Sequence, residues 1–165
     1  MGVLHDFDTA PESVARETVL PCCAAPEWLD RVVALRPFHQ VGRLVAVGGD
    51  LIAELPWSQV RIALDAHPRI GERMAGAGRE AAWSRREQSG AGDADAETAS
   101  ALIKANKLYE ERHGHVFLIF ATGRSAAEML AAARERVDND GPTERAIVRE
   151  ELAKIVRLRL ERLFT

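Results

Sequence analysis

The stretch that decides the fold is Thr143–Leu163, TERAIVREELAKIVRLRLERL, close to the end of the chain. Apolar residues recur in it at intervals of three and four from Val148 to Leu163. This spacing places them on one face of an α-helix. Arg159 falls on the same face, so the pattern predicts a long final helix with an arginine turned toward the core.

The remainder of the chain has the same helical character. It is rich in Ala, Leu, Glu and Arg, which favour helices, and aromatic residues make up only 5%. His115–Ala121, HVFLIFA, is the one run of bulky and branched apolar residues, and its length suits a buried extended segment. We therefore predict an all-α fold, a single helical bundle of seven or eight helices with one short extended segment.

Local signals predict where several helices begin and end. Thr9–Glu12 and Ser125–Glu128 have the spacing of capping boxes, which start helices. Gly48–Gly49 predicts a break within an apolar segment, and a short helix is expected over Ser58–Ala66. The stretch Arg69–Gln88 is predicted to be helical, although its phase is poorly defined by the pattern.

Composition limits the kind of protein this is. The chain has 165 residues, 47% of them hydrophobic and 28% charged, which is typical of one globular domain spanning residues 1–165. Twenty-two Lys and Arg residues against 25 Asp and Glu residues give a net charge of -3, and no dense basic block is present. This charge pattern disfavours nucleic acid as a partner.

The sequence also predicts a cytoplasmic protein with no membrane partner. No apolar run approaches the roughly 20 residues that span a bilayer, and no leader pattern is seen at the start. Cys22 and Cys23 are adjacent, and adjacent cysteines seldom reach disulfide geometry. We interpret them as small buried hydrophobic residues in a reducing compartment.

His67 is the first candidate for chemistry. It precedes Pro68, and proline disfavours the helical conformation in the residue before it. The imidazole is therefore expected on a fixed corner, where it either transfers protons near neutral pH or caps the end of a helix.

A second candidate is the segment that contains Ser84, Glu87 and Gln88. Their spacings of three and four place a hydroxyl, a carboxylate and an amide on one helical face. Such a face suits a polar ligand, but Ser84 and Glu87 also have the spacing of a capping box. These residues alone leave both interpretations open.

Two further features suit an anionic or polar ligand. Ala121–Ser125 directly precedes a predicted helix, so its N–H groups either bind a carboxylate or ureido oxygen or form a plain turn. A buried Arg159 needs an anion, which is either a structural carboxylate or a bound substrate. Alternatively, Arg159 is a surface residue whose long aliphatic stem covers the core.

The sequence does not predict a metal site or a cofactor. His113 and His115 by themselves make a weak metal site, and we expect them to be exposed at a helix end. The chain contains no phosphate-binding loop, no glycine-rich dinucleotide motif and no His-Glu-x-x-His motif. An active site here is expected to work by proton transfer and electrostatics.

Taken together, these motifs resemble one family. The Ser-x-x-Glu-Gln motif about seventeen residues after His-Pro is specific, and the resemblance covers nearly the whole chain. The chain resembles the 2-oxo-4-hydroxy-4-carboxy-5-ureidoimidazoline (OHCU) decarboxylases of urate breakdown. The stretches that carry the resemblance are Cys22–Cys23 with Trp28, Arg36–Phe38, Ala66–Glu72, Ser84–Gln88, Asn106–Glu110 and Gly114–Ser125.

The resemblance implies an all-helical, cofactor-free lyase that converts OHCU to (S)-allantoin. It implies that His67 is the catalytic proton donor and that Glu87 is the second catalytic residue. It also implies a homodimer. The substrate-binding positions that it carries over are Pro68, Ser84, Arg85, Arg86, Gln88, Ile119, Phe120, Ala121, Thr122, Gly123 and Arg159.

Two positions depart from the family pattern. Phe120 stands where cysteine is common, and His113 stands where phenylalanine usually precedes glycine. A bulky Phe120 beside the pocket keeps an alternative open, in which a helical module of the same fold binds or decarboxylates a different ureide or imidazolone. A module that has lost the chemistry is expected to lack His67, Glu87 or Arg159, and all three are present.

Overall fold

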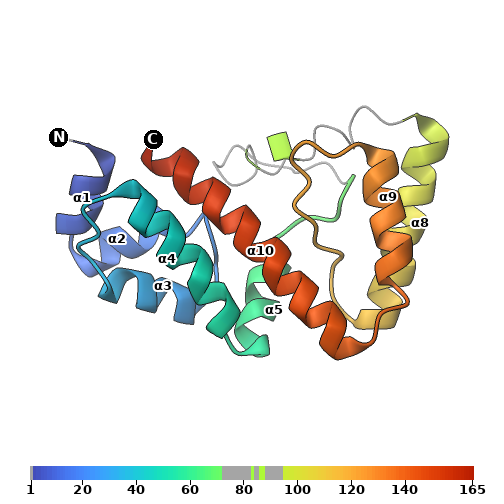
Figure 1. Ribbon diagram of the computed structural model, residues 1–165, viewed down its shortest axis with the longest axis horizontal. Helices are drawn as coiled ribbons and strands as arrows, with labels where there is room; N and C mark the ends of the chain where they lie inside the picture. Colours follow the sequence, from blue (N-terminus) through green and yellow to red (C-terminus); the bar gives the residue numbers. More distant parts are fainter. Residues whose placement is uncertain (1, 72–82, 84–85, 88–94) are drawn as a thin grey trace. The chain divides into compact units, whose positions relative to one another are not determined.

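The described part of the chain folds mainly as helices. The computed structural model describes residues 2–71, 83, 86–87 and 95–165, and within this part it has eight helices and no strand (Figure 1). The all-α prediction is confirmed, and residues 116–121 of the predicted extended segment His115–Ala121 form neither helix nor strand. The helices are α1 (Val3–Thr9), α2 (Glu12–Val19), α3 (Pro26–Ala34), α4 (Val41–Glu54), α5 (Trp57–Asp65), α8 (Ala96–His113), α9 (Ala126–Arg136) and α10 (Gly141–Phe164).

The chain divides into two compact units. The first comprises Met1–Ala63 and Leu152–Thr165, and the second comprises Leu64–Glu151. Helix α10 begins in the second unit and ends in the first. No helix in the described ranges is both long and apolar enough to cross a membrane. The prediction of one domain over residues 1–165 stays a prediction.

Aromatic side chains form much of the core of the first unit. The Phe7 ring stacks on Phe38 with a centroid distance of 6.4 Å and meets Phe164 edge-on at 5.3 Å. Trp28 is completely buried, and its Nε1 donates a hydrogen bond of 2.8 Å to the carbonyl of Gly48. A buried indole N–H needs such an acceptor.

The predicted break at Gly48–Gly49 is wrong, because α4 continues through both glycines. A Cβ atom at Gly48 would lie 2.4 Å from Cδ1 of Leu160, and one at Gly49 would lie 2.2 Å from Nε of Arg157. The glycines therefore allow α10 to approach α4 closely, and their role is packing between helices.

One of the two predicted capping boxes is correct. At Ser125 the side chain accepts from the N–H of Glu128, and the Glu128 carboxylate accepts from Ser125 N–H. Thr9 instead ends α1, where its hydroxyl donates to the carbonyl of His5 at 2.9 Å. Helix α2 starts after Pro11 without a side-chain cap. The Thr9 prediction failed because the preceding residues already form a helix.

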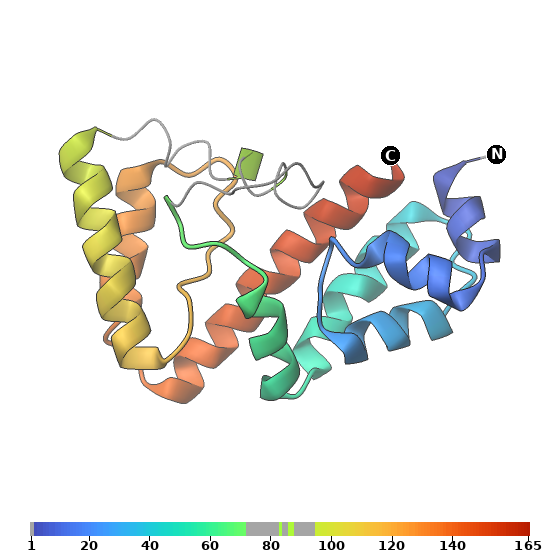
Figure 2. The ribbon, with the colours of Figure 1, turned by 180° about the vertical axis from the view of Figure 1, so that it is seen from behind.

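In the second unit, α8 and α9 lie side by side (Figure 1, Figure 2). The extended run after α8 adds to their shared core, which is built from Ile70, Leu102, Ala105, Tyr109, Phe117, Ile119, Ala121, Met129, Leu130 and Ala133. An extended conformation there buries Phe117 and Ile119 on the core side. This core holds the run that includes the predicted substrate-binding residues Ile119 and Ala121.

The helix predicted over Arg69–Gln88 lies mostly outside the described residues. Within it, Trp83 and residues 86–87 are helical, whereas residues 69–71 are not. Gly71 has a φ of +89°, a left-handed conformation that ends any helix reaching it. The predicted start of this helix is therefore wrong.

Candidate active site

His67 lies just beyond the end of α5. Its N–H donates to the carbonyl of Leu64 at 2.9 Å, which closes the last turn, and the side chains of His67 and Pro68 are half-buried. The prediction that Pro68 holds His67 out of the helix is confirmed. Its role in proton transfer stays a prediction.

The chain that follows His67 is held against α8. Asn106 is buried, and its Nδ2 donates to the carbonyl of Ile70 at 2.9 Å. Arg69 donates two hydrogen bonds to the carboxylate of Glu110, at 2.6 and 3.2 Å. These contacts start two residues after the imidazole and restrict the corner that carries it.

Glu87 is buried at 6% exposure and is helical. Trp83, four residues earlier, is also buried, whereas Arg86 is exposed. Of the predicted face, the structure therefore describes Glu87 alone, and this carboxylate is buried. The other predicted members of this motif, Ser84, Arg85 and Gln88, lie outside the described residues.

The predicted substrate-binding segment continues the extended run. Ile119 and Ala121 are each 4% exposed, Phe120 and Thr122 are half-buried, and Gly123 is exposed with a φ of +79°. Within the described part of the chain, the N–H groups of Ala121, Thr122 and Gly123 donate to no protein acceptor. Main-chain donors that precede a helix suit a carboxylate or carbonyl oxygen.

Arg159 is buried, as the spacing in the last helix predicts. It is 1% exposed, and its Nη1 donates to the carbonyl of Pro21 at 3.1 Å. Arg159 belongs to the first unit, whereas His67, Glu87 and the segment Ile119–Gly123 belong to the second. Its contact with substrate stays a prediction.

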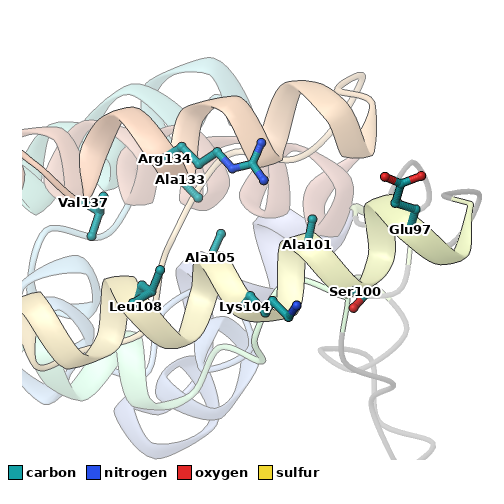
Figure 3. A pocket seen from close by; sticks show the side chains of 9 residues that line it. All are labelled: Glu97, Ser100, Ala101, Lys104, Ala105, Leu108, Ala133, Arg134 and Val137. Carbon is teal, nitrogen blue, oxygen red and sulfur yellow. The ribbon is translucent and has the colours of Figure 1, made fainter.

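Two pockets lie beside α8. One of about 480 Å³ lies between α8 and α9, and none of the predicted site residues lines it (Figure 3). Its lining residues are Glu97, Ser100, Ala101, Lys104, Ala105, Leu108, Ala133, Arg134 and Val137. The other, of about 440 Å³, is lined by Arg69, Ile70 and Gly71 together with residues of α8. The second is the pocket that includes the chain following His67.

A buried charged cluster in the second unit was not predicted from the sequence. Oε1 of the fully buried Glu144 accepts from Arg136 at 2.6 and 2.8 Å and from the Tyr109 hydroxyl at 2.5 Å. Asn139 donates to Oε2 of Glu144 at 3.1 Å. Nη1 of Arg136 donates to the carbonyl of Leu118 at 2.8 Å, so the cluster holds the main chain just before the predicted substrate-binding segment.

The charges of this cluster are stable at neutral pH. Burial raises the pKa of Glu144, but hydrogen bonds from Arg136 and Tyr109 outweigh it and leave that pKa below its usual value. Burial and the hydrogen bond to Glu144 raise the pKa of Tyr109 far above its usual value of 10.0. Near pH 7, Glu144 is therefore ionised and Tyr109 keeps its proton.

One sequence signal points to this cluster. Glu144 lies four residues before Val148 and so extends the inward face of the last helix. A carboxylate on a buried face needs donors, but the sequence does not reveal that they are Arg136 and Tyr109.

The expectation that His113 and His115 are exposed is wrong for His115, which is 8% exposed. Nε2 of the half-buried His113 lies 3.1 Å from the carbonyl of Arg136, and both rings pack against Tyr109. These neighbours, distant in sequence, account for the burial. In the part of the chain that the structure describes, no group of three His, Cys, Asp or Glu residues is arranged to hold a metal ion.

Comparison with known proteins identifies the family. The family model described as OHCU decarboxylase matches residues 8–161. The chain belongs to the OHCU decarboxylase family. The match covers both units and every predicted site residue.

Two curated relatives agree with this family. The chain is 34% identical over 143 residues to the 2-oxo-4-hydroxy-4-carboxy-5-ureidoimidazoline decarboxylase of Amia calva, covering 86% of this chain and 79% of that protein. It is 36% identical over 153 residues to the uric acid degradation bifunctional protein TTL of Arabidopsis thaliana, covering 87% of this chain and 45% of that protein. The second relative is thus more than twice as long as the matched region.

Solved structures show the same fold. A crystal structure of OHCU decarboxylase in the presence of (S)-allantoin matches with a TM-score of 0.76 and 29% identity, covering 88% of this chain and 95% of that one. A crystal structure of (S)-allantoin synthase matches with a TM-score of 0.70 at 15% identity, covering 98% of this chain and 54% of that one. At that identity the second match shows the fold alone.

Proposed function

We propose that this OHCU decarboxylase family member removes CO2 from OHCU and delivers a proton stereospecifically to give (S)-allantoin, with His67 and Glu87 as the catalytic residues. The observation that carries the proposal is the family match over residues 8–161, within which His67 lies on a non-helical corner and Glu87 is buried. The activity places the protein in urate degradation.

The chemistry requires little besides orientation and proton transfer. The bond between the ring carbon and the carboxylate breaks, CO2 leaves, and the electron pair delocalises into the imine-like nitrogen of the substrate's own ring. The hydroxyl on that carbon loses its proton and becomes the ring carbonyl, and the ring nitrogen gains a proton. A proton delivered to one face of the neighbouring, ureido-bearing carbon gives the S isomer. No electron sink beyond the substrate is needed, so the proposal includes no cofactor.

Each remaining residue has a proposed role in orientation. Arg159, a permanent cation, holds an anionic group of the substrate. Ser84 and Gln88 and the main-chain amides of Ala121–Gly123 hydrogen-bond the ring or ureido group. Glu87 and His67 manage the hydroxyl group and the delivered proton. The further residues proposed to line the site are Pro68, Arg85, Arg86, Ile119 and Phe120.

Two further properties belong to the proposal, the compartment and the oligomeric state. We propose that the protein acts in the cytoplasm, which agrees with Cys22 and Cys23 being buried and forming no disulfide. We also propose a homodimer, for which light scattering of the purified chain is the direct measurement. A monomeric mass at micromolar concentration would contradict the dimer without affecting the proposed reaction.

The test is product chirality. OHCU is generated in situ from urate, the protein is added, and the circular dichroism of the product is followed against a sample without protein. Spontaneous decay of OHCU gives racemic allantoin, so only the enzyme produces a growing (S)-allantoin signal. Racemic product at the uncatalysed rate would contradict the proposal and favour a different ureide or imidazolone as the ligand.

His67→Ala is the decisive variant. We expect turnover to fall by at least about a hundredfold, the usual contribution of a positioned proton donor, while the helical circular dichroism is unchanged. His5→Ala is the matched control, because His5 is an exposed histidine on α1. Near-normal activity of His67→Ala would remove His67 from the mechanism.

A further inference from the structure

Both polar main-chain groups of Phe120 are already bound by side chains. Its N–H donates to Oε1 of Glu151 at 3.4 Å, and its carbonyl accepts from Nε of Arg124 at 3.1 Å. Phe120 therefore has no main-chain donor left for a ligand. The donors of the proposed substrate-binding segment that lack a protein acceptor, within the described residues, are the N–H groups of Ala121, Thr122 and Gly123.

Glu151 reaches Phe120 from a helix far away in the sequence. It lies on α10, is 5% exposed and is separated from Phe120 by 31 residues. A carboxylate that is buried to this extent must accept hydrogen bonds, and an N–H group that donates to a carboxylate is held more firmly than one that donates to a neutral oxygen. The contact therefore fixes the direction of the peptide plane between Ile119 and Phe120.

The segment is restrained on both sides of Phe120. Two residues before Phe120, the carbonyl of Leu118 accepts a hydrogen bond of 2.8 Å from Arg136 of α9. After it, the carbonyl of Ala121 accepts from the N–H of Arg124 at 3.0 Å, which closes a tight turn. Arg124 thus holds the two peptide groups that carry the Ala121 and Thr122 amides, and Glu151 holds the Ile119–Phe120 peptide group that directly precedes them.

We infer that Glu151 is a positioning residue for this reaction: by holding the Phe120 N–H, it orients the main-chain amides of Ala121–Gly123 to receive the substrate. The inference rests on the proposed function of that segment. Preorganised donors bind a ligand without an ordering cost, so loss of the restraint weakens substrate binding more than it slows the chemical step. Glu151 itself touches no reacting atom in this scheme.

Two conservative variants separate position from charge. Glu151→Gln keeps the side-chain length and an acceptor oxygen but removes the charge, whereas Glu151→Asp keeps the charge and shortens the reach to Phe120. We expect Glu151→Asp to raise KM about tenfold, as the loss of one hydrogen bond to a charged group does, with kcat within about threefold of the parent. We expect Glu151→Gln to keep KM within about threefold of the parent, because it keeps the acceptor.

A second measurement does not depend on turnover. Hydrogen exchange of the Phe120 amide reports the contact directly, and we expect it to be slow in the parent and in Glu151→Gln but faster in Glu151→Asp. Melting temperatures of all three proteins show that each is folded at the assay temperature. Exchange and KM that change together in Glu151→Asp support the positioning role.

The outcomes that overturn this inference are distinct from those that overturn the reaction. If the parent yields (S)-allantoin and folded Glu151→Asp keeps the parent's KM, Glu151 has only a structural role. If Glu151→Gln raises KM as much as Glu151→Asp, the charge matters and the acceptor position does not, which also overturns the inference. If the parent itself yields only racemic allantoin, the proposed function fails, whereas the exchange measurement still tests the Glu151 contact.

Discussion

Around Trp28 in the first unit, helices pack through apolar surfaces, and glycines in α4 leave room for the side chains of α10. Around Tyr109 in the second unit, a carboxylate and a guanidinium are buried together, and one of their hydrogen bonds reaches the main chain at Leu118. Apolar contacts have no preferred direction, whereas a hydrogen bond fixes both the distance and the angle between its two groups. In the unit that contains the proposed substrate-binding segment, a buried ion pair takes part in orienting the main chain.

The largest effect should come from breaking the buried ion pair of the second unit. Glu144→Gln leaves Arg136, which is 6% exposed, without its negative partner. We expect the free energy of unfolding at neutral pH to fall by about 3–5 kcal/mol, the usual result of stranding a buried charge. Urea unfolding followed by circular dichroism measures this loss.

The matched control removes the stranded charge. Adding Arg136→Met to Glu144→Gln should cost less than the sum of the two single changes, because the double variant contains no unpaired buried ion. A loss below about 1 kcal/mol for Glu144→Gln, the value of an exposed pair, would show that the second unit does not depend on this cluster.

A smaller effect is expected from the glycines of the first unit. In Gly48→Ala, the new methyl group meets Cδ1 of the fully buried Leu160 at 2.4 Å, and we expect a loss of about 1–3 kcal/mol from overpacking. In Gly49→Ala, the new methyl group meets Arg157, whose side chain is 41% exposed and can move outward at the cost of its exposed ion pair with Asp50. Alanine also favours the helix by up to about 1 kcal/mol, so Gly49→Ala should be nearly neutral.

Thermal unfolding of the two alanine variants compares them directly. A larger loss for Gly48→Ala than for Gly49→Ala is expected, since a buried leucine cannot move aside as an exposed arginine can. Equal losses would contradict this account of how α4 and α10 pack.

The prediction with the smallest effect concerns Tyr109, the single tyrosine of the chain, and it applies at alkaline pH. Its pKa is raised in the folded state, so the folded protein keeps this proton at alkaline pH values where the unfolded chain releases it. The free energy of unfolding should therefore decline as the pH rises above about 10. The tyrosinate absorbance band measures the titration without interference from another tyrosine.

Tyr109→Phe is the control for this titration. It lacks the ionising hydroxyl, so its unfolding free energy should decline less steeply above pH 10 than that of the parent. Appearance of the tyrosinate band near pH 10 in the folded parent would show that the hydroxyl is not held by Glu144 as described.

Local rules were sufficient for several features of the site. The position of His67 outside the helix follows from Pro68, because proline restricts only its immediate neighbour. The burial of Arg159 follows from its place on the apolar face of the last helix. Both predictions depend on residues a few positions apart, within the range over which sequence determines geometry.

Local rules failed where a distant partner decides the outcome. The pair Gly48–Gly49, taken alone, predicts a helix break. The close approach of Leu160 explains why the helix has a glycine at position 48. His115 reads as exposed by itself, and its burial depends on Tyr109 and the neighbouring core.

The sequence by itself determined the helical class, the family and the identity of the candidate catalytic residues, because these depend on short-range spacing and on motifs that are read directly. The tertiary structure alone decided that Glu144 meets Arg136 and Tyr109 and that Glu151 meets the Phe120 amide. These partners lie 8, 35 and 31 residues apart. Their pairing depends on how helices pack, since a buried carboxylate accepts from whichever donors the fold brings to it.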